Sequence, residues 1–437
     1  MNYQRQICVI DLCGNVRFLF GLLWYNNTMI DLSQKPRDYS VLFLDMNAYF
    51  ASVEQQVQPP LRGQPIGITP YTGGTGCVIA RSYEAKEWGI TVGDLVRDAK
   101  NKCPKIQIIE ARPALYQLYH KEILKVLERH SPNALPLSID EFLLRLTGSD
   151  VSYERSLKMA QDIKSDLKAV GDYLTCSIGI GPNYFLAKVA GESKKPDGLT
   201  VIELNELDNF YSQLNLRDLP GINFRMEFQL AKRGIYRVSD FFKLDLVTIS
   251  KMFGHMGKAW FYRLRGYEID SFEIKNKSCG HSHVLPPELR SEQGARATIR
   301  KLVEKTGYRL RKQKLWATGI YVSIHFLEGG GFNLAKRTNL FNDNSTFQKE
   351  IDFMLKKCRW HKPLYVAVNA FGLVQNKNQQ ISIFPEIERS RNISKALDRI
   401  NDTYGANTIF PASVFSAKSS APDRIPFGIP RYDIRNF

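Results

Sequence analysis

The sequence predicts a multidomain protein of the α+β class. The apolar run Val41–Leu44 stops at Asp45 and is typical of a buried strand. Residues 136–147 are expected to form a second strand, and residues 174–180 alternate at the strand period. A helix is predicted between these strands because apolar residues recur at helical spacing, at Leu157, Ala160, Ile163, Leu167 and Val170. This order of elements predicts a sheet with helices packed on one of its faces.

The segments around this sheet have a different texture. A helix is expected over residues 48–58, because Pro59-Pro60 follows and stops it. Residues 63–112 mix small strands, a short helix and a Gly-rich turn. From about residue 203 the chain becomes short helices and turns, and Leu219–Ile222 and Phe253–Gly257 each look like a turn between two helices. These changes predict separate small domains on either side of residue 203.

The C-terminal third is strongly basic. The chain has 437 residues and a net charge of +16, and residues 275–385 carry 19 Lys and Arg against 7 Asp and Glu. Alternation at Ile320, Val322, Ile324 and Phe326 predicts a strand with one apolar and one polar face. A helix is predicted over residues 299–310, with an apolar stripe (Ile299, Leu302, Val303, Thr306 and Leu310) opposite a basic one (Arg296, Arg300, Lys301, Lys305, Arg309 and Lys312). A basic module of this kind favours a phosphate backbone as its partner.

Other features exclude several protein classes. Seven scattered cysteines without a CxxC pair indicate neither a zinc site nor a disulfide framework, and they fit a reducing cytosol. The apolar stretch Arg17–Tyr25 is far shorter than the ~20 residues that span a bilayer, and it lacks a signal-peptide cleavage site. Two interpretations of the N-terminus are open. Residues 1–38 form an N-terminal extension, or the natural protein starts at Met29. We therefore expect a cytoplasmic, nucleoid-associated protein without a membrane partner.

Carboxylates stand at the ends of two predicted strands. Asp45 follows the first strand, and Asp140-Glu141 lies in the second. Three carboxylates brought together by adjacent strands repel one another, and hard divalent cations relieve that repulsion. Two such ions can activate an attacking 3′-hydroxyl and stabilise a leaving pyrophosphate. From spacing alone, capping or salt-bridged acids explain these residues as well as a metal site does.

Four motifs make the chain similar to the Y family of translesion DNA polymerases. They occur in family order, and the similarity runs from about residue 40 to 385. The motifs are Asp45-Met-Asn-Ala-Tyr-Phe-Ala-Ser-Val-Glu54, Ala80-Arg-Ser-Tyr-Glu-Ala-Lys86, Ser138-Ile-Asp-Glu141, and Ser177-Ile-Gly-Ile-Gly-Pro-Asn-Tyr-Phe-Leu-Ala-Lys-Val-Ala190 running on to Lys194-Lys-Pro-Asp-Gly198. The resemblance implies template-directed addition of dNTPs to primer-template DNA, without proofreading.

The resemblance also implies a right-hand architecture. Its parts are a ferredoxin-like palm (39–48 and 114–202), small fingers (49–113), a helix-hairpin-helix thumb (203–270), an αβ little finger (278–386) and a C-terminal tail (387–437). Two Mg²⁺ ions, or Mn²⁺ in their place, are expected on Asp45, Asp140, Glu141 and the Met46 carbonyl. Tyr83, Lys86 and Lys195 fall where the family contacts the triphosphate. Phe50 falls at the steric gate against a ribose 2′-hydroxyl, or else is an ordinary core aromatic.

Three departures from the family pattern bear on these roles. Asn47 stands where an Asp is common, and we do not count it as a metal ligand. Lys86 stands where many relatives carry Arg, so bidentate phosphate contact is lost there. Asn223 replaces the second Gly of the thumb hairpin, and a left-handed Asn would preserve the turn.

The C-terminal region suggests partners. Gln380-Ile-Ser-Ile-Phe384 resembles the bacterial sliding-clamp motif. Asn47 and the tail, with a helix expected over residues 394–404, resemble the polymerase V catalytic subunit, whereas Tyr83 and Lys194-Lys195-Pro196 resemble polymerase IV. The polymerase V likeness implies an accessory protein and a recombinase filament as partners, and a role in the SOS response.

Two other functions compete with this interpretation. A non-catalytic scaffold on a polymerase fold would bind DNA and clamp without synthesis, but all three expected carboxylates are present. A nucleotidyl cyclase shares palm-like sheets and two-metal chemistry, but it should lack the hairpin thumb and the basic C-terminal module. Primer extension by the purified chain separates the polymerase from both.

Overall fold

The computed structural model describes residues 35–70, 76–272, 278–375 and 385–421, together with the backbone of β1 (Val9–Ile10) and β2 (Val16–Arg17). The chain divides into two compact units, of which the second extends from Glu273 to Asp423. Among the described residues, no helix is both long and apolar enough to cross a membrane.

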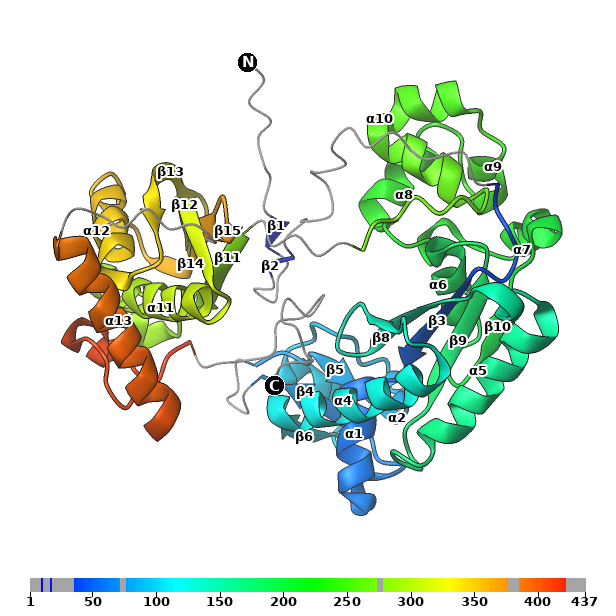
Figure 1. Cartoon of the computed structure of the whole chain (residues 1–437), viewed down its shortest axis with the longest axis horizontal. Coiled ribbons are helices and arrows are strands. Elements are labelled where there is room, and N and C mark those ends of the chain that lie inside the picture. Colours follow the sequence, from blue (N-terminus) through cyan, green and yellow to red (C-terminus); the bar gives the residue numbers. More distant parts are fainter. Residues whose placement is uncertain are drawn as a thin grey trace. The chain divides into compact units, whose positions relative to one another are not determined.

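A five-stranded sheet forms the centre of the first unit (Figure 1). Its strand order is β10 (Leu199–Val201), β9 (Cys176–Gly181), β3 (Val41–Met46), β8 (Glu141–Arg145) and β7 (Leu135–Pro136). β3 is antiparallel to both of its neighbours, and all six of its residues are buried. The apolar run before Asp45 is therefore the central strand, as its sequence predicts.

Helices cover both faces of this sheet, so the expectation of helices on one face is wrong. Leu42 and Leu44 pack in a core with residues of α4 (Pro113–His130) and α5 (Tyr153–Leu167), which follows the short turn η2 (Gly148–Asp150). Val41 and Phe43 point the other way, into a cluster with Ala187 of α6 (Tyr184–Ser193). α6 approaches closely because Gly179 lies opposite Phe43, where a Cβ would meet the Ala187 carbonyl oxygen at 2.0 Å.

The strand expected over residues 136–147 is in fact two strands. β7 ends at Pro136 and β8 begins at Glu141, and a tight turn lies between them. The turn closes through the Leu137 amide, which donates to the Glu141 carbonyl at 2.8 Å. Asp140 therefore lies in a turn rather than inside a strand.

A smaller sheet with three strands also belongs to the first unit. β4 (Ile66–Thr69) lies between β5 (Ala80–Arg81) and β6 (Gln107–Glu110). Its helices are α1 (Tyr49–Val57), the 3₁₀ turn η1 (Pro59–Leu61), α2 (Tyr83–Glu87) and α3 (Val96–Lys102). α1 ends where Pro59-Pro60 predicted, because proline lacks the amide that would continue the helix.

The rest of the first unit is helical. Its elements are η3 (Leu204–Glu206), α7 (Leu207–Ser212), η4 (Leu216–Asp218), α8 (Phe224–Ala231), α9 (Val238–Phe242) and α10 (Leu246–Arg263). Both predicted turns are present: Gly221 has φ +92° between η4 and α8, and Gly254 has φ +57° within α10. Asn223 is not left-handed as expected. It is the extended N-cap of α8, and its side chain accepts hydrogen bonds from the amides of Arg225 and Met226.

The second unit is an antiparallel sheet covered by helices. Its strands run in the order β11 (Ser278–Val284), β14 (Pro363–Phe371), β12 (Leu315–Phe326) and β13 (Gly331–Phe341), with β15 (Val374–Gln375) beside β12. Its helical elements are η5 (Pro287–Leu289), α11 (Glu292–Lys312), α12 (Asn344–Leu355), α13 (Pro385–Tyr404) and η6 (Ala412–Ala417). The predicted apolar stripe of α11 and the apolar face of β12 together form the core.

The basic stripe of α11 is not the open surface that its sequence suggests. Lys301 is 5 % exposed, and its ammonium group donates to the carbonyls of Lys418 and Ser420. Lys305 donates to the carbonyl of Ala421 at 2.8 Å. The C-terminal segment around η6 therefore covers part of this stripe, and these lysines satisfy backbone carbonyls rather than facing solvent.

Candidate active site

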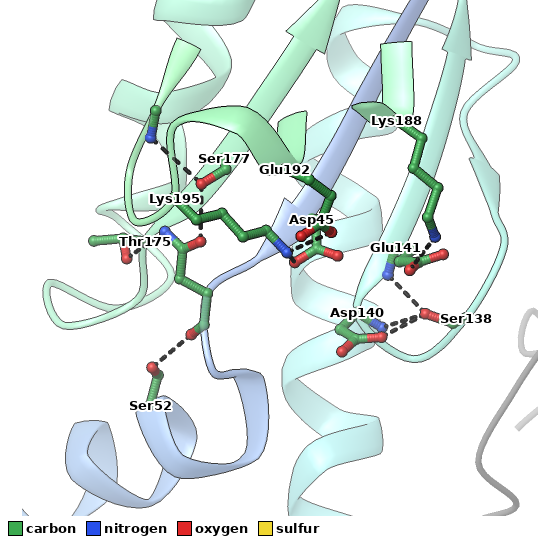
Figure 2. Close-up of polar contacts among 12 residues, drawn as sticks. Asp45, Ser52, Ser138, Asp140, Glu141, Thr175, Ser177, Lys188, Glu192 and Lys195 are labelled. Carbon is green, nitrogen blue, oxygen red and sulfur yellow. Dashed lines mark hydrogen bonds and ion pairs between the residues drawn. The ribbon is translucent and has the colours of Figure 1, made fainter. Parts of the chain in front are cut away.

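Two adjacent strands bring the predicted carboxylates together. Asp45 and Glu141 are opposite one another in the antiparallel pairing of β3 with β8. The Met46 amide donates to the Asp140 carbonyl at 2.9 Å, which places Asp140 at the same end of β3. Figure 2 shows the three carboxylates around the ends of these strands. Strand register thus joins residues that lie almost a hundred positions apart in the chain.

Asp45 is buried and paired with a lysine. Its side chain oxygen Oδ1 accepts a hydrogen bond from Lys195 Nζ at 2.7 Å, and Lys195 also contacts Glu192 Oε1 at 2.7 Å. Burial raises the pKa of Asp45 to about 7, with Lys195 acting to lower it and Asp140 to raise it further. A carboxylate in this environment gains from any additional cation.

Asp140 and Glu141 are held by a turn and by a second lysine. The Ser138 hydroxyl donates to Asp140 Oδ1 at 2.5 Å and accepts a hydrogen bond from the Glu141 amide at 2.9 Å. Burial, with the charge of Glu141, raises the pKa of Asp140. Lys188 Nζ of α6 contacts Glu141 Oε1 at 2.6 Å and lies 5.1 Å from the centre of the Phe43 ring. Asp45 and Glu141 therefore each pair with a partly buried lysine.

Two of the three residues expected at the triphosphate lie close to Asp45. Lys195 contacts Asp45 directly, and Tyr83 begins α2. Burial raises the pKa of Tyr83, the charge of Lys195 lowers it and that of Asp45 raises it, so the phenol lies within electrostatic reach of this pair. Lys86 is exposed, with Nζ 5.7 Å from the centre of the Tyr83 ring. Lys195 and Tyr83 thus lie near Asp45, and Lys86 lies beside the Tyr83 ring.

Comparison with known proteins identifies the family. A model of the impB/mucB/samB family matches residues 44–192, and a model of that family's C-terminal domain matches residues 276–383. DNA polymerase IV of Moorella thermoacetica is 31% identical over 387 residues, which cover 86% of this chain and 96% of that protein. The chain belongs to the Y family of DNA polymerases.

Further similarities agree with this assignment. DNA polymerase IV of Pelotomaculum thermopropionicum is 29% identical over 385 residues, covering 85% of this chain and 94% of that protein. A solved Y-family DNA polymerase chimera matches the fold with a TM-score of 0.68 at 22% identity, over 76% of this chain and 99% of that chain. The α+β polymerase fold expected from the sequence is confirmed, and the chain is a DNA-directed DNA polymerase of the translesion class.

Phe50, the predicted steric gate of this Y-family polymerase, is a buried residue of α1. Phe50 is 6 % exposed, and its ring stacks on Tyr116 of α4 with centroids 4.4 Å apart. Its neighbour Tyr49 is as deeply buried, and the Tyr49 hydroxyl donates to the Tyr116 carbonyl at 2.6 Å. Burial alone does not separate a gate from a core aromatic, so the assignment of Phe50 stays a prediction.

Asn47 has a structural partner for each atom of its amide group. Its Nδ2 donates to Thr175 Oγ1 at 3.0 Å, and its Oδ1 accepts from Ser177 Oγ at 2.9 Å. Its carbonyl accepts from Ser52 Oγ at 2.7 Å at the start of α1. Asn47 thus ties β3 to β9 and α1, which favours its exclusion from the ligand set.

The donors at this site are of the type that Mg²⁺ prefers, namely carboxylates and a backbone carbonyl. Within the described ranges, no three His, Cys, Asp or Glu side chains lie in an arrangement that could hold a metal ion. Asp45 and Glu141 instead contact Lys195 and Lys188. Burial is the main cause that raises the pKa of Asp45 and that of Asp140, and a bound divalent cation would offset this cost of ionisation. The donor types therefore suit Mg²⁺, and metal binding at Asp45 and Glu141 would displace the two lysine contacts.

Sequence reasoning missed two supporting residues. Lys188 and Ser138 stand inside the quoted motifs, yet no role was predicted for either. A lysine among the apolar residues of α6 is a usable signal, because a buried ammonium group needs a carboxylate partner. Ser138 gives no comparable signal, since its hydrogen bonds depend on the turn that separates β7 from β8. The clamp motif at Gln380–Phe384 lies outside the described residues.

Proposed function

We propose that this chain adds deoxynucleotides to a primer 3′-hydroxyl on a DNA template by two-metal-ion catalysis. The observation that carries the proposal is the convergence of Asp45, Asp140 and Glu141 at the ends of β3 and β8. Carboxylates that face one another across two strands are unfavourable without cations, and divalent cations can promote nucleotidyl transfer.

The metal ions would be held by Asp45, Asp140, Glu141 and the Met46 carbonyl. Bound there, two divalent ions would favour ionisation of the primer hydroxyl and neutralise charge on the triphosphate. Ser138 fixes Asp140 through the 2.5 Å hydrogen bond, and the β3–β8 register fixes Asp45 opposite Glu141. The chain's own contribution is thus to hold these oxygens in place before the substrate binds.

Lys195, Lys86 and Tyr83 would bind the incoming triphosphate. Lys195 is at present an ion-pair partner of Asp45 and Glu192, and a triphosphate offers the same ammonium group stronger acceptors. Release of Lys195 from Asp45 would then accompany metal binding to Asp45. Phe50 would exclude ribonucleotides by occupying the space of a 2′-hydroxyl.

The domain roles are proposals of the same kind. Residues 39–48 and 114–202 would act as palm, 49–113 as fingers, 203–270 as thumb and 278–386 as little finger. The turn at Gly221, which precedes the capped N-terminus of α8, would contact a phosphate. In the second unit, Arg337 is an exposed cation on the polar face of β13, which pairs with the strand that carries Tyr321 and Ser323. This sheet face would contact the DNA backbone.

A sliding clamp would bind the peptide Gln380–Phe384. The support is the sequence motif alone, in which Gln380 and Phe384 would enter a hydrophobic pocket of the clamp. An accessory protein of the polymerase V type and a recombinase filament are proposed on the likeness of the tail.

Primer extension by the purified chain tests the proposal. The substrates are undamaged and abasic templates, with Mg²⁺, with Mn²⁺ and with a chelator. We expect extension that requires the metal and that continues past the abasic site. A chain that binds primer-template DNA and extends neither template under any of these conditions would be the non-catalytic scaffold.

A further inference from the structure

Helices α1 and α4 pack against each other at Phe50, and aromatic and polar contacts join them. On α1, Phe50 and Glu54 are four residues apart and share a face. On α4, Arg112 is the N-cap and Tyr116 follows four residues later. The two pairs match, because Phe50 stacks on Tyr116 and Glu54 contacts Arg112.

The stack is close and nearly parallel. The ring centroids of Phe50 and Tyr116 are 4.4 Å apart, and the ring planes differ by 15°. Tyr116 is fully buried, at 0 % exposure, and belongs to the main core. A phenyl ring in contact with such a surface has no room to retreat in that direction.

Polar contacts fix Tyr116 itself. Its hydroxyl donates to Glu54 Oε1 at 2.8 Å, and its carbonyl accepts the Tyr49 hydroxyl at 2.6 Å. Glu54 is also fully buried and is satisfied by Arg112, whose Nε donates to Oε1 at 3.1 Å and whose Nη2 contacts Oε2, and by Gln58 Nε2 at 3.2 Å. These partners hold the Glu54 carboxylate in place, since removal of any one of them would leave its buried charge less compensated.

We propose that Tyr116, anchored by Glu54 and Arg112, is a positioning residue that sets sugar selection by keeping the Phe50 ring from yielding to a ribose 2′-hydroxyl. The inference rests on the proposed function of Phe50 as the gate. Steric exclusion depends on how far the excluding ring can move, because the repulsion between overlapping non-bonded atoms falls steeply as they separate. A ring on a rigid support therefore discriminates more strongly than the same ring on a soft one.

Selectivity measurements on the whole chain test this. Single-nucleotide insertion gives kcat/KM for matched dNTP and rNTP pairs, and their ratio is the selectivity. Tyr116→Leu removes the stacked ring, and we expect selectivity to fall at least ~tenfold through better use of the rNTP. Tyr116→Phe keeps the ring but loses the bond to Glu54, and a fall of roughly threefold is expected. Tyr116→Phe also serves if Tyr116→Leu does not fold.

Two controls separate positioning from general damage. Ile123→Ala opens a cavity in the same core from the same helix, so it should lower stability while selectivity is unchanged. In a Phe50→Ala background Tyr116→Phe should have no further effect on selectivity, because it acts through the ring that has been removed. A further fall in that background would show that Tyr116 acts by another route and would overturn the inference.

The outcomes also separate this inference from the gate assignment. If Phe50→Ala relaxes selection and both Tyr116 variants keep wild-type selectivity, the gate stands and the role of Tyr116 is rejected. If Phe50→Ala leaves selection unchanged, Phe50 is a core aromatic and both assignments fail together. Tyr49→Phe, which removes only the hydroxyl bonded to Tyr116, should relax selection less than Phe50→Ala does.

Discussion

Partly or fully buried lysines in the two units have different kinds of partner. In the first unit, Lys195 and Lys188 contact the side chains of Asp45 and Glu141. In the second unit, Lys301 and Lys305 contact backbone carbonyls of residues 418–421. A carboxylate can exchange a lysine for another cation, whereas a backbone carbonyl in a packed segment has no alternative donor.

The difference separates lysines that could take part in the reaction from lysines that stabilise the fold. Formal charge places a large excess of cations in residues 275–385. Several of them are engaged internally, since Arg311 forms a bidentate pair with Asp398 and Lys336 contacts Glu350. A net charge therefore indicates a polyanionic partner without telling which cations touch it.

The largest expected effect compares one lysine from each unit. Lys195→Met should reduce primer extension roughly a hundredfold with a raised KM for the dNTP, because a direct contact to the triphosphate is lost. Lys301→Met should leave kcat and KM of the folded enzyme unchanged. Steady-state single-nucleotide insertion measures both. Equal losses in the two variants would abolish the distinction between exchangeable and structural lysines.

The second prediction concerns stability, where the lysine of the second unit should have the larger effect. Lys301→Met leaves the carbonyls of Lys418 and Ser420 without their donor, so local opening of α11 should become easier by about 1–3 kcal/mol. Hydrogen exchange of the α11 amides reports this opening. The matched control is Lys356→Met, an exposed lysine just after α12. Protection of α11 that is unchanged in Lys301→Met would mean that η6 packs without the help of this lysine.

The third and smallest effect concerns DNA binding by the second unit. Arg337→Met should weaken primer-template binding and reduce the slope of log K against log salt by about one, since one phosphate contact is lost. Lys305→Met should change neither quantity, because this lysine contacts the Ala421 carbonyl. Titrations at several salt concentrations decide. A reduced slope in Lys305→Met alone would place the DNA on the α11 side of the unit.

Much of the core was predictable from periodicity. Val41–Leu44 forms the central strand, and the apolar stripe of α11 faces the core, because these patterns report which side of an element is buried. Periodicity does not tell what covers the opposite side. Lys301 pairs with residues 418 and 420, and α6 packs on the second face of the central sheet. Both contacts are made by segments that come later in the chain than the element they cover.

The site was predictable where motif and register coincide. Asp45 and Glu141 lie opposite one another because the expected strands pair, although the second strand begins later than expected. The lysine partner of Glu141 and the hydroxyl partner of Asp140 were not predicted. Both contacts are made by single side chains within a turn or a helix. Sequence patterns predict the turn or helix itself better than they predict which side chains touch. The support of Phe50 by Tyr116 is of the same kind, since it joins α1 to α4.

Single-turnover primer extension by Asp140→Ala is the most direct test of the catalytic site. Asp140 contributes a carboxylate held by Ser138, so its loss should abolish extension while primer-template affinity stays within about twofold of wild type. Asp172→Ala, which removes an exposed carboxylate paired with Arg62, is the matched control and should extend normally. Extension by Asp140→Ala at a rate near that of wild type, with the same requirement for Mg²⁺, would show that the carboxylates at the ends of β3 and β8 are not the catalytic site.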